Sequence, residues 1–171
     1  MPSAVELARM LSSLPPEQRA ALLDANRAGF DRLVGLRYDV VEDARVVATL
    51  DVGPDHLQPY GLVHGGVYAM MIESVCSVGE ALRQLAQGRN VVGVENTTRF
   101  LQGARTGSAL RAEATALDVE EEHRGCWEAT VTDAEGRTCA TGRLVLAILP
   151  ADATVGGEAV SLPDFVTDAS D

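Results

Sequence analysis

The chain has 171 residues and a formal net charge of −11, with 46 % apolar and 23 % charged residues. This length suits one domain with a buried core and is short for two, and the composition is ordinary for a globular protein. The negative charge argues against nucleic acid or an anionic membrane as the main partner, because both need clustered Lys and Arg.

A helical extension ahead of the main domain is predicted for residues 1 to 29. A short helix is predicted from Ala4 to Leu11 and a second from Pro16 to about Ala28, since proline is favoured in the first turn of a helix. Residues 30 to 36 predict one further short turn of helix that leads into strands.

A β-hairpin is predicted next, with arms from Arg37 to Val41 and from Arg45 to Val52. Apolar and polar residues alternate along the second arm, which is typical of a strand with one buried face. Gly53-Pro54 ends the hairpin, and a long loop follows.

A helix is predicted from Val67 to about Ala86. It is apolar on nearly all sides, as expected of a helix buried in a core, and its two glutamates make it unsuitable as a membrane span. Its polar residues Glu73, Ser77, Glu80 and Gln84 are spaced by four, three and four, so they share one stripe. Glu73 lies in the most apolar part, which predicts a buried carboxylate with a function. Glu80 and Gln84 either extend that site or form a solvated strip.

Four more strands are predicted after this helix from their alternating pattern, over residues 90–101, 108–119, 125–133 and 137–149. Trp127, Ala129 and Val131 share one face of their strand. This face must cover something apolar, and the only long apolar helix is the candidate. The pattern therefore predicts an α+β fold in which an antiparallel sheet wraps around the central helix, within a domain of residues 30–149.

The last segment, residues 150–171, predicts an acidic and poorly ordered tail. Its final 21 residues contain five acidic and no basic side chains, together with Gly156-Gly157 and Pro163.

Three cysteines, Cys76, Cys126 and Cys139, each lie within an apolar stretch and lack the spacing of metal ligands. This pattern predicts buried free thiols in a reducing compartment, with no disulfide and no metal site. The N-terminus lacks the apolar segment of a signal peptide, so a cytoplasmic location is expected.

The start of the central helix carries a second candidate feature. Gly65-Gly66 would leave backbone N–H groups uncovered at the positive end of the helix dipole, where they suit an anion or a developing oxyanion. Gly65 lies eight residues before Glu73, or about 12 Å along a helix, which is too far for both to act on one small centre. Two antiparallel copies of the helix across a two-fold axis would bring them together, so the spacing predicts a homodimer with two shared sites.

These residues also carry a resemblance to a known family. The run of Gln58, Gly61-Leu62-Val63-His64-Gly65-Gly66, Glu73 and Ser77 resembles the hotdog-fold acyl-CoA thioesterases, in particular the 4-hydroxybenzoyl-CoA thioesterase and phenylacetate-pathway (PaaI-like) branch. The resemblance covers about residues 36–149. It implies a hotdog fold, and it implies hydrolysis of an aryl- or medium-chain acyl-CoA to the free acid and CoA.

The resemblance further implies a role for each residue of the run. Glu73 would act as nucleophile or general base, and the Gly65 N–H of the neighbouring subunit would polarise the thioester carbonyl. Gln58 would donate a second hydrogen bond near that carbonyl. His64 would shape the loop or, as the alternative, act as an acid or base. Ser77 would hold the attacking water or orient the carboxylate, or it is a small packing residue.

The substrate itself gives further expectations. No cofactor is implied, because CoA is part of the substrate, and the resemblance implies a dimer of dimers, that is, a homotetramer. Gly66 and Tyr68 are expected to contact the substrate. The CoA phosphates require cationic groups, for which Arg99, Arg105 and Arg124 are candidates.

Two other functions remain open at this point. A hotdog domain could bind acyl-CoA without cleaving it, although a pure binder would have little reason to keep Glu73 in an apolar helix. A hydratase or dehydratase is disfavoured, because the histidine and acid pair that such enzymes use is not found at the expected places.

Overall fold

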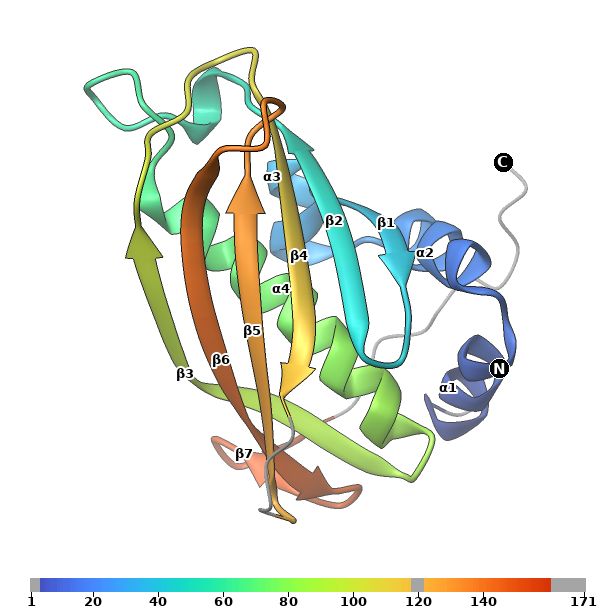
Figure 1. Ribbon diagram of the computed structural model, residues 1–171. Helices are drawn as coiled ribbons and strands as arrows, with labels where there is room; N and C mark the ends of the chain where they lie inside the picture. Colours follow the sequence, from blue (N-terminus) through green and yellow to red (C-terminus); the bar gives the residue numbers. More distant parts are fainter. Residues whose placement is uncertain (1–3, 118–121, 161–171) are drawn as a thin grey trace.

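The computed structural model describes residues 4–117 and 122–160 (Figure 1). Its helices and strands, in chain order, are α1 (Ala4–Ser13), α2 (Pro16–Ala25), α3 (Gly29–Val34), β1 (Arg37–Val41), β2 (Arg45–Asp51), the 3-10 helix η1 (Pro54–His56), α4 (Gly65–Leu85), β3 (Arg89–Phe100), β4 (Ala109–Leu117), β5 (Arg124–Thr132), β6 (Thr138–Pro150), β7 (Thr154–Val155) and β8 (Glu158–Ala159).

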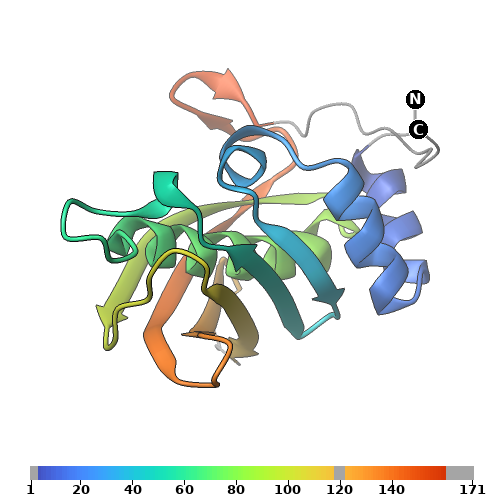
Figure 2. The same ribbon diagram turned by 90° about the horizontal axis from the view of Figure 1, so that it is seen from above.

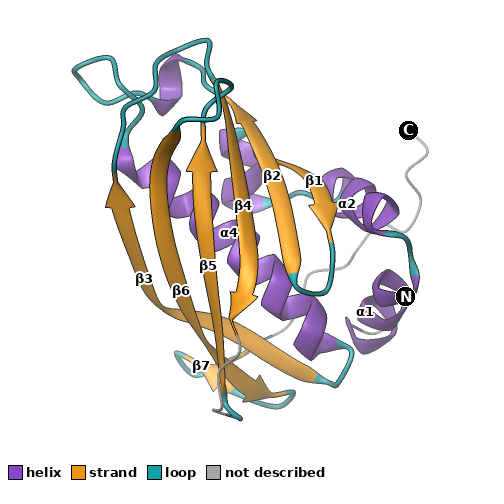
Figure 3. Ribbon diagram, in the orientation of Figure 1, coloured by secondary structure: helices purple, strands orange, loops and turns teal. Residues whose placement is uncertain are grey.

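Six antiparallel strands form one sheet in the order β1-β2-β4-β5-β6-β3, which leaves β1 and β3 at its two edges. The helix α4 runs diagonally across one face of the sheet, and the strands curve around it (Figures 1 and 3). Trp127, Ala129 and Val131 are buried on the inner face, as their alternation predicts. The predicted α+β architecture, with the sheet around one helix, is therefore confirmed.

The N-terminal helices lie at the β1 end of the sheet (Figure 2). α2 packs against β1, and α1 packs against α4. Arg19 is only 8 % exposed and holds this corner, since its guanidinium pairs with Asp43 at 2.6 Å and donates to the carbonyls of Ser12 and Leu14. An edge strand exposes unpaired backbone groups, and α2 covers that edge at β1.

Several element boundaries differ from the prediction. α2 ends at Ala25, three residues early, because Asn26 leaves the helical conformation, and α3 then begins at Gly29, whose φ is +54°. Part of the tail is a two-stranded hairpin, β7 with β8, next to which the amide of Asn90 donates to the carbonyl of Val160 at 3.1 Å. The prediction of a poorly ordered tail is wrong for this part. The rest of the predicted tail, residues 161–171, and the last two residues of the strand predicted over 108–119 lie outside the described residues.

The three cysteines are buried free thiols, as predicted. Burial raises the pKa of Cys76, which keeps this thiol protonated. The described helices include none that is long and apolar enough to cross a bilayer.

Gly79 of α4 packs directly against Trp127 of β5. A Cβ atom at this position would lie 2.3 Å from Cη2 of Trp127, whose indole is fully buried. We expect Gly79→Ala to lower the free energy of unfolding by about 1–3 kcal/mol through overpacking, even though alanine favours helix by about 1 kcal/mol over glycine. Urea denaturation measures this change. The destabilisation should shrink in a Trp127→Phe background, and an unchanged destabilisation there would contradict the packing explanation.

Candidate active site

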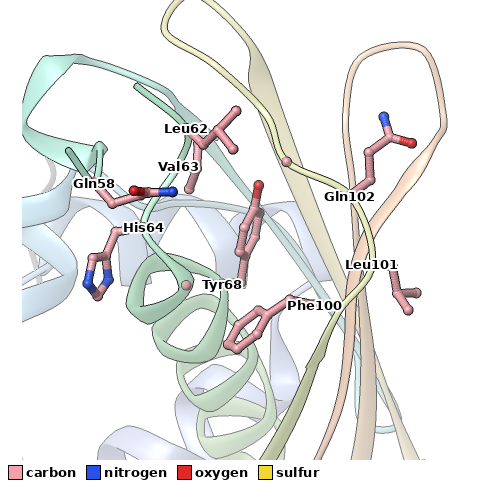
Figure 4. A pocket seen from close by; sticks show the side chains of 10 residues that line it. Gln58, Leu62, Val63, His64, Tyr68, Phe100, Leu101 and Gln102 are labelled. Carbon is pink, nitrogen blue, oxygen red and sulfur yellow. The ribbon is translucent and has the colours of Figure 1, made fainter. Parts of the chain in front are cut away.

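A pocket of about 560 Å³ opens at the N-terminal end of α4 (Figure 4). We call it the helix-start pocket. It is formed by the loop before α4, the first turn of α4 and the end of β3, through Gln58, Leu62, Val63, His64, Gly65, Tyr68, Phe100, Leu101, Gln102 and Gly103. The ring of Phe100 lies beside the first turn of the helix in Figure 4, where a Cβ atom on Gly65 would be 3.0 Å from its Cζ.

His64 is the N-cap of α4. Its Nδ1 accepts the N–H of Gly66 at 2.9 Å, so the imidazole closes the turn that opens the helix. These contacts support a structural role for His64, which is one of its two expected roles. Gly66 is therefore not an uncovered donor, contrary to expectation. The N–H of Gly65 has no acceptor among the described residues, and it remains the donor at this helix end.

Gln58 and Tyr68 line the same pocket in different ways. The Oε1 atom of Gln58 accepts the N–H of Tyr60 at 3.1 Å, and the side-chain NH₂ has no acceptor within the described part of the chain. Tyr68 is only 3 % exposed, and its hydroxyl accepts the N–H of Ala104 at 3.1 Å. Burial raises the pKa of Tyr68. Gln58 is thus free to donate to a ligand, whereas Tyr68 contributes its ring as a wall.

A second pocket, of about 490 Å³, holds Glu73, and we call it the carboxylate pocket. It lies between α3, the start of β1 and the outer side of α4, and it is lined by Phe30, Asp31, Tyr38, Gly66, Ala69, Met70, Glu73, Ser74, Ser77 and Val78. Ser77 and Gly66 thus belong with Glu73. Glu73 is exposed in the single chain, so the prediction of a buried carboxylate is wrong. The reason is that its side of α4 lies beside β3, the edge strand of the sheet, where the described residues leave it uncovered.

Asn96 of β3 reaches Glu73 and was not singled out from the sequence. Its Nδ2 donates to the carbonyl of Ala69 at 3.0 Å and lies 3.5 Å from Oε2 of Glu73. These two contacts hold the amide between β3 and α4, beside the carboxylate. An asparagine in a polar stretch of strand carries no sequence signal for such a contact.

Glu80 and Gln84 share the stripe with Glu73 but not its surroundings. Glu80 is 2 % exposed and accepts hydrogen bonds from Trp127 Nε1 at 2.7 Å and Gln84 Nε2 at 2.6 Å. Both predictions for Glu80 and Gln84 are therefore wrong: they do not form a solvated strip, and they do not extend the site around Glu73. The helix crosses the sheet diagonally (Figure 1), and the stripe is exposed at Glu73 and covered by Trp127 at Glu80.

The candidate arginines lie outside both pockets. Arg99, Arg105 and Arg124 are exposed, and none of them lines the helix-start pocket or the carboxylate pocket. Arg105 comes near the loop of the helix-start pocket, since its guanidinium would be 3.7 Å from a Cβ atom on Gly61. The arrangement brings Gln58, His64, Gly65 and Tyr68 together in one pocket, and Gly66, Glu73 and Ser77 in the other.

Comparisons with known proteins agree with this architecture. The model of the thioesterase superfamily matches residues 60–140. The 1,4-dihydroxy-2-naphthoyl-CoA hydrolase of Escherichia coli is 32 % identical over 129 residues, covering 75 % of this chain and 90 % of the relative. The proofreading thioesterase EntH of Cronobacter sakazakii is 33 % identical over 116 residues, covering 68 % and 82 %.

A solved structure extends the likeness to the fold. The crystal structure of AziG from S. sahachiroi superposes with a TM-score of 0.66 at 32 % sequence identity, covering 72 % of this chain and 98 % of that protein. Together with the sheet around α4 and the two pockets, these matches show the family: the chain belongs to the thioesterase superfamily and is a hotdog-fold thioesterase, an enzyme that hydrolyses thioesters.

Proposed function

We propose that this enzyme hydrolyses an acyl-CoA with an aryl or medium-length acyl group, using Glu73 of one subunit and the Gly65 N–H of its neighbour. One observation carries the proposal: the donor and the carboxylate line different pockets of the same chain, and the two pockets share no residue. Each pocket holds half of what thioester hydrolysis requires, which supports a site that a second chain completes.

The free edge of β3 supports the assembly. Among the described strands β3 pairs only with β6, and Val94, Phe100 and Leu101 on or just after β3 are exposed. An unpaired edge strand with exposed apolar side chains can pair with the same strand of a second copy. Because Asn96 of β3 contacts Glu73, such a pairing would place the partner close to the carboxylate pocket. We propose a homodimer with two shared sites, arranged as a dimer of dimers.

The chemistry follows from the two halves. An oxygen of Glu73 attacks the thioester carbonyl carbon, or Glu73 takes a proton from a water that attacks it, and negative charge builds on the carbonyl oxygen. The Gly65 N–H at the helix end stabilises that charge, with the amide of Gln58 as a second donor. The C–S bond then breaks and CoA leaves as the thiol, with a proton that comes from the water consumed. In the nucleophilic route, that water hydrolyses the anhydride between the acyl group and Glu73, which releases the free acid. Ser77, one turn beyond Glu73, is within reach of the same water or carboxylate. The mechanism calls for no cofactor, since CoA belongs to the substrate.

The walls of the carboxylate pocket support the acyl class. Phe30, Ala69, Met70 and Val78 give it an apolar lining, and a methionine adapts to flat or extended groups. The relative from E. coli is named for an aryl-CoA, 1,4-dihydroxy-2-naphthoyl-CoA, which favours an aryl acyl group here.

Thiol release from a panel of aryl- and alkyl-CoA esters tests the proposal. We expect saturable turnover, with the highest kcat/KM for one of the aryl esters. Saturable binding of these esters without thiol release would instead identify a non-catalytic acyl-CoA-binding module.

Asn96→Ala should lower kcat by about tenfold, because the carboxylate of Glu73 loses the neighbour that holds it beside β3. Asn96→Asp provides the matched comparison, since it keeps the shape and replaces the donor with a second negative charge. Steady-state kinetics of both variants, with thermal unfolding as a check of the fold, measure the effect. Unchanged kcat in both would show that Asn96 does not position Glu73.

A further inference from the structure

The carboxylate pocket contains a second acid that the proposed chemistry does not use. Asp31 of α3 lines this pocket together with Glu73. Its Oδ1 accepts the hydroxyl of Ser74 at 2.6 Å, and its Oδ2 accepts the hydroxyl of Tyr38 at 2.7 Å. Because Ser74 follows Glu73 in α4, these hydrogen bonds fix the carboxylate of Asp31 in the wall beside the catalytic position.

The charged side chains that line this pocket are all negative. Its ten lining residues include two acids, Asp31 and Glu73, and no Lys, Arg or His. Arg27, from the same segment, is paired with Asp24 at 2.9 Å and donates to the carbonyl of Leu36. Burial, with the charge of Asp31 next, raises the pKa of Tyr38, so the phenol remains a donor and adds no charge of its own.

An acyl group attacked by Glu73 must lie beside it, and therefore in the same pocket as Asp31. A negative charge on that group would face a fixed carboxylate with no cation in the lining to compensate it. We propose that Asp31 is a specificity-determining residue that admits neutral acyl groups and rejects acyl groups that carry a carboxylate. This inference rests on the proposed function, which places the acyl group beside Glu73.

A pair of esters that differ only in charge tests this inference. We choose 4-carbamoylbenzoyl-CoA, which is neutral, and 4-carboxybenzoyl-CoA, which has nearly the same shape. In the wild type, kcat/KM should be at least about tenfold higher for the neutral ester. Asp31→Asn should raise the ratio of carboxylated to neutral kcat/KM by about tenfold. Comparing the ratio between variants cancels the intrinsic reactivity of the two esters.

The design of the variants separates charge from structure. An asparagine at position 31 can still accept from Tyr38 and donate to Ser74, so the wall keeps its hydrogen bonds. Asp39→Asn is the matched control, because Asp39 is an exposed acid of β1 that lines neither pocket. We expect this control to leave the ratio unchanged. A ratio that is the same in Asp31→Asn as in the wild type would overturn the inference.

A binding measurement keeps this test distinct from that of the proposed function. The thioethers S-(4-carbamoylbenzyl)-CoA and S-(4-carboxybenzyl)-CoA cannot be hydrolysed, and calorimetry gives their Kd values. We expect the carboxylated thioether to bind at least about tenfold more weakly, with the difference reduced in Asp31→Asn. Equal Kd values would overturn the charge selection, whether or not the enzyme turns over either ester.

Discussion

Replacing Glu73 with glutamine should lower kcat/KM for every ester by about 10³-fold or more. A positioned general acid or base supplies about 10²–10⁴-fold in rate, and the loss should exceed this range if Glu73 is the nucleophile. Glutamine has the shape of glutamate and can still accept from Asn96, so the pocket should keep its geometry. It can neither form an acyl anhydride with the substrate nor take a proton from water. Thiol release under single-turnover conditions measures the loss.

The control for this variant removes the charge of a different glutamate. Glu17 is an exposed acid of α2 that lines neither pocket, and Glu17→Gln should retain wild-type kinetics. Thermal unfolding should show the same transition for both variants and the wild type. A Glu73→Gln enzyme that keeps more than about a tenth of the wild-type rate would contradict the role of this carboxylate.

Replacing Gly65 with proline should lower kcat by about 10²–10³-fold, the loss seen when one donor to a developing oxyanion is removed. Gly65 is the first residue of α4, the position where proline is best tolerated, because its N–H has no partner within the helix. The preceding residue, His64, has φ −63° and ψ 135°, which is the conformation that proline requires of its neighbour. The substitution therefore removes the N–H with little change to the backbone.

Gly65→Ala is the matched control for the proline variant. A Cβ atom at this position meets the ring of Phe100 at 3.0 Å in both variants, but alanine keeps the N–H. The ratio of kcat between the two variants thus isolates the hydrogen bond from the contact with Phe100. Equal rates for alanine and proline would show that the Gly65 N–H does not stabilise the transition state.

Local patterns in the sequence predict most of the fold, because burial repeats at every second residue in strands and along the faces of helices. The strands of the six-stranded sheet and α4 agree with their predicted bounds within about two residues. α4 begins at Gly65 and not at Val67, because the side chain of His64 caps the two glycines into the first turn. A capping contact of this kind depends on a rotamer, which the pattern of residues does not encode.

The candidate site is predictable only in part. The motif residues and their spacing predict that Gly65 and Glu73 are the two halves of a site, and the spacing predicts that two chains are needed to join them. Asn96 and Asp31 were missed, because they reach α4 from β3 and α3, and contacts between distant segments leave no local signal. Glu80 lies seven residues after Glu73 on the same stripe of the helix. Glu80 is a buried structural acid because α4 passes under Trp127 at that point, whereas Glu73 is the candidate catalytic acid, and the sequence does not distinguish the two positions.

Mixing two inactive variants tests the shared site most directly. Chains with Glu73→Gln and chains with Gly65→Pro, each with a different affinity tag, are co-expressed and the doubly tagged assembly is isolated. If the sites are shared, each mixed dimer contains one site with both wild-type groups, and we predict recovery of up to about half of the wild-type activity per dimer. Activity no higher than that of the two parent variants would contradict a site built from two subunits.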